Sequence, residues 1–126
     1  MERFTLKKEE RLCSPKTLER LFTEGESFLV FPLKVVFLKT ESSLPYPASA
    51  AFAVSKRNFK RAVKRNLLKR RMREAYRLNK NLLYDELATK NGRISIMFIF
   101  VGKDVSEFAP IEKAMISALK KVAGKI

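Results

Sequence analysis

The sequence of 126 residues contains no histidine, no tryptophan and only one cysteine. Without histidine the chain lacks the commonest general acid and base, every Ser–His or Cys–His nucleophile pair, and the commonest side-chain ligand of zinc and iron. The lone Cys13 excludes an internal disulfide framework and a Cys-rich zinc site. We therefore expect that the side chains of this protein do not themselves perform bond chemistry.

Glycine and acidic residues are also sparse. Four scattered glycines exclude a glycine-rich phosphate-binding loop. The 13 Asp and Glu residues are outnumbered by 27 Lys and Arg residues, and no paired carboxylates share a convincing face for Mg²⁺. An autonomous protein nuclease, which needs an acidic cluster or histidine, is therefore poorly supported, and we expect no metal site on the protein itself.

Long hydrophobic runs are absent too. The longest extends from Ile94 to Val101, is interrupted by Ser95, and is too short to span a bilayer. The first ten residues are charged and lack the apolar core of a signal peptide. These features predict a cytoplasmic protein with no membrane partner.

The apolar patterns predict one folded domain over residues 1–126, with 46% apolar residues and ten Phe to build its core. Their order predicts an α+β protein in which helices cover one sheet. We expect a helix over about 15–24, strand structure over 28–39 that can split at Pro32, a strand over 48–55, a basic helix over about 59–79 capped by Asn58, a continuation over 82–90, a central strand over 93–102, and a last helix over 106–124. Strands 28–39 and 48–55 are expected to pair as a hairpin.

The basic helix is the feature of the sequence that points most directly to function. Residues 56–77 hold eleven of the 27 basic residues and one acid, Glu74. At 100° per residue, the polar residues fall within an arc of about 140°; they are Arg65, Asn66, Lys69, Arg70, Arg73 and Arg77. The apolar side, interrupted by Lys64 and Arg71, is expected to pack on the core; it comprises Val63, Leu67, Leu68, Met72 and Ala75. Such a dense positive face attracts a polyanion, and nucleic acid is the densest in a cell.

The segment Ala62 to Arg73, AVKRNLLKRRMR, resembles the signature helix of the bacterial ribonuclease P protein component. The preceding segment Phe52 to Arg57 resembles the strand that enters this signature. Residues 6–25 resemble the opening segment of the family, with Leu18, Phe22 and Gly25 at matching positions. The resemblance covers roughly residues 5–120.

The resemblance implies a function and a fold. The protein would be the small subunit of an RNA–protein complex that removes the 5′ leader from precursor tRNA. The ribonuclease P RNA would be the catalyst and would hold the Mg²⁺ that activates water. The fold would have the order αβββαβα with a left-handed βαβ crossover, similar to a domain of a ribosomal protein.

The resemblance also implies two binding surfaces. The catalytic RNA would contact a basic set comprising Lys56, Arg57, Arg65, Asn66, Lys69, Arg70 and Arg73. A cleft between the first helix and the sheet would hold the leader, with the positions Leu18, Phe22, Val36 and Phe52. Ordinary helix-to-sheet packing remains the alternative for Leu18 and Phe22. Leu67 replaces a common arginine of the family, and Leu18 and Val36 stand at or near frequent aromatic positions.

Other interpretations of the basic helix stay open at this point. A ribosomal or other architectural RNA-binding protein could carry a similar helix by convergence. Arginine–phosphate contacts do not identify the sugar, so DNA is also a possible partner. A solvated helix face normally mixes both signs of charge, and a membrane-surface helix needs a broader apolar side, so both are weaker hypotheses.

Overall fold

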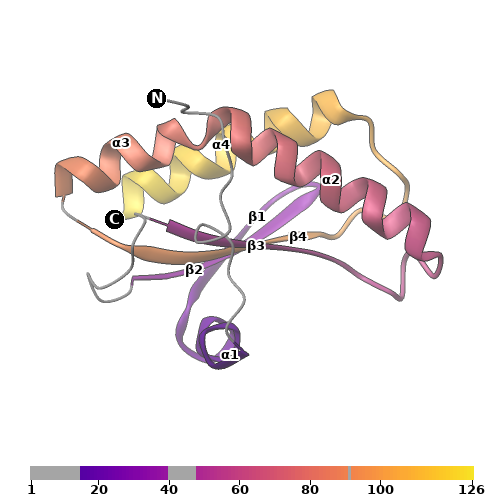
Figure 1. Ribbon diagram of the computed structural model, residues 1–126, viewed down its shortest axis with the longest axis horizontal. Helices are drawn as coiled ribbons and strands as arrows, with labels where there is room; N and C mark the ends of the chain where they lie inside the picture. Colours follow the sequence, from indigo (N-terminus) through magenta and orange to yellow (C-terminus); the bar gives the residue numbers. More distant parts are fainter. Residues whose placement is uncertain (1–14, 40–47, 91) are drawn as a thin grey trace.

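The computed structural model describes residues 15–39, 48–90 and 92–126, which form four helices and four strands (Figure 1). In chain order they are α1 (Pro15–Glu24), β1 (Glu26–Val30), β2 (Leu33–Lys39), β3 (Ala48–Val54), α2 (Ala62–Asn79), α3 (Asn81–Lys90), β4 (Ile94–Phe100) and α4 (Phe108–Lys125). This confirms the α+β class, the split of the first strand region at Pro32, and the break that separates α2 from α3. Cys13 and Asn91 lie outside the described residues.

The strands form one sheet in the order β1-β2-β4-β3. β1 pairs with β2 and β2 with β4 in antiparallel fashion, whereas β3 and β4 are parallel. The hairpin expected between strands 28–39 and 48–55 is therefore wrong. Neighbours in sequence usually pair, but the apolar strand β4 lies between β2 and β3, where the sheet can bury it.

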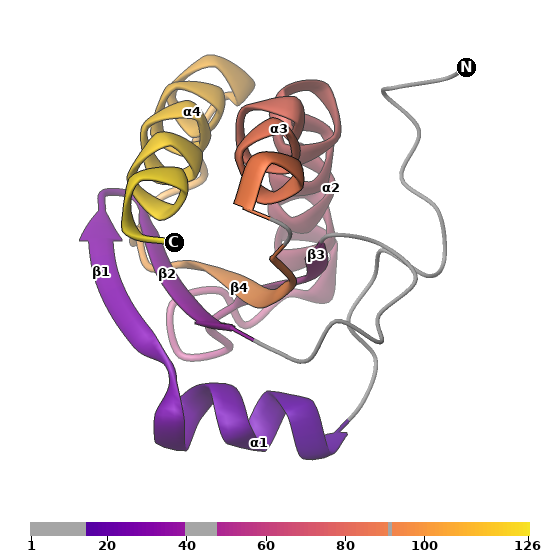
Figure 2. The same ribbon diagram turned by 90° about the vertical axis from the view of Figure 1, so that its left-hand side faces the viewer.

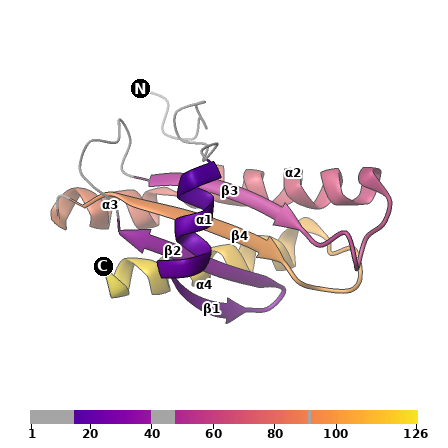
Figure 3. The same ribbon diagram turned by 90° about the horizontal axis from the view of Figure 1, so that it is seen from below.

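The parallel strands β3 and β4 are joined by a crossover through α2 and α3. Figure 2 looks along these two strands, which run away from the viewer, and Figure 3 shows their common direction. From β3 the chain passes over the helical layer and returns to β4 on the left of β3. The crossover is left-handed, as the resemblance implied, and departs from the usual right-handed rule.

The helices lie on both faces of the sheet but are divided unequally. α2, α3 and α4 cover one face, and α1 alone lies against the other (Figures 1 and 2). The main core fills the space under the three helices, and α4 contributes Ile111, Met115, Ala118, Leu119 and Val122 to it. None of the helices in the described part of the chain has the length and apolar character that a bilayer crossing requires.

The start of α2 differs from the expectation. α2 begins at Ala62 with Arg61 at its N-cap position, and Asn58 does not cap it. Instead, Asn58 Nδ2 donates a hydrogen bond to the carbonyl oxygen of Gly102 at 3.4 Å. Val63, expected on the packed side, is 78% exposed, because the first turn of α2 extends beyond the core.

Gly25 connects α1 to β1 at a point of close backbone approach. Its N–H donates to the carbonyl oxygen of Leu21 at 3.0 Å, which ends the helix. A Cβ atom at residue 25 would lie 2.4 Å from that oxygen, 3.0 Å from the carbonyl oxygen of Phe37 and 3.1 Å from Val36 Cγ1. Because two of these neighbours are backbone atoms, a side chain here would push α1 away from β2.

We expect Gly25→Ala to lower the free energy of unfolding by about 1–3 kcal/mol, the usual cost of overpacking. Urea unfolding followed by circular dichroism measures this change. Gly124→Ala is the matched control, since nothing lies within 4 Å of a Cβ at that helical position. The control should be neutral or stabilising by up to about 1 kcal/mol. Equal stability of the two variants would show that the close approach at Gly25 is unimportant.

Candidate nucleic-acid interface

α2 carries a buried side and a basic side, as its sequence predicts. Leu68, Met72 and Ala75 are fully buried against the core. On the opposite side, Asn66, Arg70 and Arg73 are exposed and Lys69 is half-buried. We call these four residues, Asn66, Lys69, Arg70 and Arg73, the basic ladder. Their spacing of three or four residues places neighbouring side chains roughly 5–6 Å apart at Cβ, on a helix that the core holds in place.

Arg65 has a different environment from the basic ladder. Its Nη1 donates hydrogen bonds to the carbonyl oxygens of Phe59 and Lys60, at 2.7 and 2.8 Å. The side chain therefore holds the loop before α2 against the first turn of the helix. Arg65 belongs to the predicted polar arc, but its side chain binds nearby carbonyl oxygens, which are acceptors that a helical projection does not show. Its Nε and Nη2 groups take no part in these two bonds.

The loop before α2 also presents Lys56 and Arg57, which are both exposed. Arg57 N–H donates to Ser55 Oγ at 3.2 Å, and Phe59 N–H donates to the Ser55 carbonyl oxygen at 3.1 Å. The Phe59 ring is buried next to Phe100, with 5.9 Å between ring centroids. The loop is thus fixed at its apolar residue while Lys56 and Arg57 face solvent.

Arg77, at the end of the predicted arc, is paired within the helix. Its Nε and Nη2 donate to Glu74 Oε1 and Oε2 at 2.8 and 2.6 Å. These hydrogen bonds from Arg77 lower the pKa of the Glu74 carboxyl below its ordinary value. The pair partly neutralises the last turn of α2, so the strongly positive part of the ladder ends near Arg73.

Phe52 does not belong to the cleft under α1. Strand alternation places it with Ala50 and Val54 on the face that α2 covers. Its ring stacks on Phe98 with a centroid distance of 5.7 Å and meets the Tyr76 ring edge-on at the same distance. The Arg73 guanidinium lies over Phe52 at 5.9 Å, so this ring supports the basic ladder instead.

The other three expected cleft residues lie on the side of α1. Figure 3, in which the sheet is seen from below, shows α1 in front of the sheet, where it crosses β2 and β4. Leu18 is half-buried, Val36 is only 4% exposed, and Phe22 is 61% exposed. Val36 therefore forms part of the packing under α1 and offers no ring or free surface, whereas the Phe22 ring is accessible to a ligand.

A cation that was not expected from the sequence lies on the α1 side of the sheet. Lys34 is exposed, and it alternates with Val35 so that it shares a face with Val36. The alternation of Leu33, Lys34 and Val35 is the signal that could have identified it. Met97 and Ile99 of β4 are half-buried on this face, which α1 covers only in part.

Within residues 15–39, 48–90 and 92–126, no three Cys, Asp or Glu side chains come close enough together to hold a metal ion. The residues expected to bind RNA lie on opposite sides of the sheet. On one side lies the basic ladder with Lys56 and Arg57, and on the other lies the face around Phe22 and Lys34.

Solved structures show the same fold. The ribonuclease P protein from Thermotoga maritima superposes with a TM-score of 0.71 at 25% identity, covering 89% of this chain and 96% of that one. The Staphylococcus aureus ribonuclease P protein gives a TM-score of 0.70 at 19% identity, covering 90% of this chain and 94% of that one.

Sequence relatives agree with the structures. The ribonuclease P protein component of Porphyromonas gingivalis is 42% identical over 124 residues, which are 98% of this chain and 90% of that protein. The protein component from Chlorobium phaeobacteroides is 42% identical over 83 residues, 64% of this chain and 57% of that protein. The sequence profile of the ribonuclease P family matches residues 6–123. The chain therefore belongs to the ribonuclease P protein family.

Proposed function

We propose that this protein binds the catalytic RNA of ribonuclease P through the basic ladder and holds the 5′ leader of precursor tRNA against the α1 face of the sheet. The complex would work in the cytoplasm, and its RNA would cut the leader with Mg²⁺. The observation that carries the proposal is the two-sided α2 helix, whose Leu68 and Met72 are fully buried while Arg70 and Arg73 face solvent. Membership of the ribonuclease P protein family supports it.

The basic ladder suits a structured RNA. Arginine presents a planar fork of donors that matches two phosphate oxygens, and Lys69 adds a compact point charge. Asn66 both donates and accepts hydrogen bonds, so it can orient the contact beside a phosphate, a ribose hydroxyl or a base edge. Because α2 is packed on the sheet, these groups pay little entropy for alignment when RNA binds.

The α1 face suits a single strand of variable sequence. A base can stack on the accessible Phe22 ring without hydrogen-bond recognition, and Lys34 can attract the adjacent phosphate. Val36 and Leu18 contribute packing that fixes the distance between α1 and the sheet. With the RNA subunit as the catalyst, the protein contributes positive charge that screens phosphate repulsion, which lowers the Mg²⁺ concentration needed for folding and substrate binding.

The decisive experiment is cleavage of a 5′-labelled precursor tRNA by a bacterial ribonuclease P RNA at low Mg²⁺, with and without this protein. We expect correct 5′ cleavage only when both components are present. The variant Arg70→Gln/Arg73→Gln should need more protein or more Mg²⁺ for the same rate. Cleavage by the protein alone would reveal an active site of its own. Tight RNA binding without stimulation would instead identify an architectural RNA-binding protein.

Binding to the RNA should weaken steeply with salt. If the protein neutralises about 5–7 phosphates, the log–log slope of affinity against salt concentration is about −4 to −6. Arg70→Gln and Arg73→Gln should each reduce this slope by about 1. Lys120→Gln removes the same charge from an exposed position on α4 and should leave the slope unchanged. Equal effects of all three variants would mean that overall charge, not the ladder, binds the RNA.

Arg65 and Arg70 should differ in their effect on stability. Arg65→Ala removes two hydrogen bonds to loop carbonyls, so we expect the free energy of unfolding to fall by about 1–2 kcal/mol. Arg70→Ala changes an exposed side chain and should stay within about 0.5 kcal/mol of the unaltered protein. Chemical denaturation of both variants checks this. Unchanged stability of Arg65→Ala would show that its hydrogen bonds do not hold the loop.

A further inference from the structure

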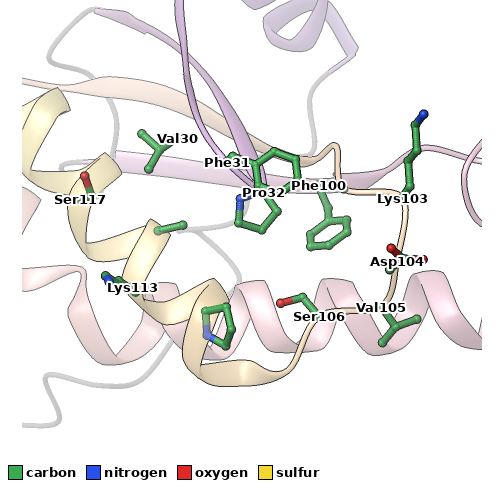
Figure 4. A pocket seen from close by; sticks show the side chains of 13 residues that line it. Val30, Phe31, Pro32, Phe100, Lys103, Asp104, Val105, Ser106, Lys113 and Ser117 are labelled. Carbon is green, nitrogen blue, oxygen red and sulfur yellow. The ribbon is translucent and has the colours of Figure 1, made fainter.

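A hollow lies at the end of the molecule where β1 turns into β2 and β4 leads into α4. It is a trough of about 610 Å³, within the range of ligand-binding pockets. Its lining includes Phe31, Pro32, Phe100, Lys103, Lys113 and Ser117. Figure 4 shows the three rings together, with Lys113 of α4 on one side and Lys103 on the other. Neither the basic ladder nor the α1 face contributes to this lining.

Phe31 is the most informative residue of the trough. It is 71% exposed, although a side chain of this size and apolarity is normally buried. Pro32 and Phe100 lie beside it and are buried, so the exposed ring borders buried apolar side chains. A flat apolar ligand can cover Phe31 and remove this surface from water.

The surroundings of the trough are strongly positive. A smaller adjoining hollow shares Lys103, Asp104 and Val105 with it and reaches the start of α2. Among the described residues, five cationic side chains and one carboxylate, Asp104, line the two hollows together; the cations are Lys60, Arg61, Lys64, Lys103 and Lys113. This balance favours a ligand that carries several negative charges next to its flat part.

The walls of the trough are held in place by hydrogen bonds. Val101 N–H donates to the carbonyl oxygen of Pro32 at 2.9 Å, which ties β4 to the β1–β2 turn. Arg71 Nη1 donates to the carbonyl oxygen of Ser106, and Asn58 Nδ2 donates to that of Gly102. The loop 102–106 is thus anchored from α2 and from the loop before it. The site is formed before any ligand arrives, which reduces the cost of binding.

We propose that this trough binds an unpaired nucleotide of ribonuclease P RNA, with the base stacked on Phe31 and the flanking phosphates near Lys103 and Lys113. A single strand fits because bases inside a duplex have no free face to stack. Lys64, which lines the adjoining hollow, lies on the side of α2 roughly opposite the middle of the basic ladder. The RNA segment bound at this site would therefore differ from the segment bound by the ladder. The identity of the RNA rests on the proposed function, but the nucleotide chemistry rests on the trough alone.

The absence of tryptophan allows a direct test, since Phe31→Trp introduces the only indole of the chain. The variant is titrated at physiological ionic strength with a single-stranded RNA hexanucleotide and with an abasic strand of equal phosphate number. Leu82→Trp is the control, because Leu82 is 39% exposed and belongs to α3, a helix that lies away from the start of α4 (Figure 1). Stacking quenches the indole, so only the base-bearing RNA should quench Phe31→Trp, and neither strand should quench Leu82→Trp.

A second measurement compares affinities for ribonuclease P RNA, with proteins that carry no introduced tryptophan. Phe31→Ala should weaken binding at least fivefold, the lower limit expected for one stacked base. Phe31→Tyr, which keeps the ring, should bind normally. No base-dependent quenching, or equal affinity of Phe31→Ala and the unaltered protein, would overturn the proposal. Quenching by the hexanucleotide together with failure of the cleavage assay would refute the proposed function but leave the nucleotide site intact.

Discussion

The burial of β4 is the constraint on which the rest of the structure depends. Ile94, Ile96, Phe98 and Phe100 are essentially inaccessible on the helical face, and this apolar strand lies between β2 and β3. Covering that face requires the layer of α2, α3 and α4. Tyr76 of α2 meets Phe98 with 5.5 Å between ring centroids, which fixes the rotation of α2 about its own axis. Once that rotation is set, the basic ladder can point only away from the core, so a packing contact determines where the charge lies.

A helix with so many like charges repels itself, and the structure relieves part of this repulsion internally. Arg65 donates to two loop carbonyls, Arg71 donates to the carbonyl oxygen of Ser106, and Arg77 pairs with Glu74. Arg65 and Arg71 hold α2 to its surroundings, and the partly negative carbonyl oxygens offset their charge. The charge of Arg77 is offset within the helix by the Glu74 carboxylate. Arg70 and Arg73 remain in solvent, where water and salt screen them. Basic residues of one helix therefore divide into those that maintain the fold and those available to a polyanion.

Local patterns predicted the elements well, and long-range packing explains what they missed. Pro32 marked the split between β1 and β2, and the apolar run at 94–101 marked the central strand. Strand alternation alone could not say which face α2 would cover, so Phe52 was assigned to the wrong side of β3. Arg65 was placed only on a helical projection, which contains no loop carbonyls. The β3–β4 pairing joins strands separated by two helices, and no nearest-neighbour pattern indicates it.

The sheet also relates the two proposed RNA surfaces to each other. The basic ladder and the α1 face lie on opposite sides of one continuous sheet, in which β2 and β4 share a register over seven residue pairs. Such a sheet deforms little, so a catalytic RNA bound to α2 fixes the position of Phe22 and Lys34 relative to itself. Under the proposed function, a leader that reaches α1 would then bind within the same complex, at an effective concentration set by geometry and not by dilution. In the proposed complex, the protein would assist cleavage in this way, by holding two RNA segments in a fixed relation.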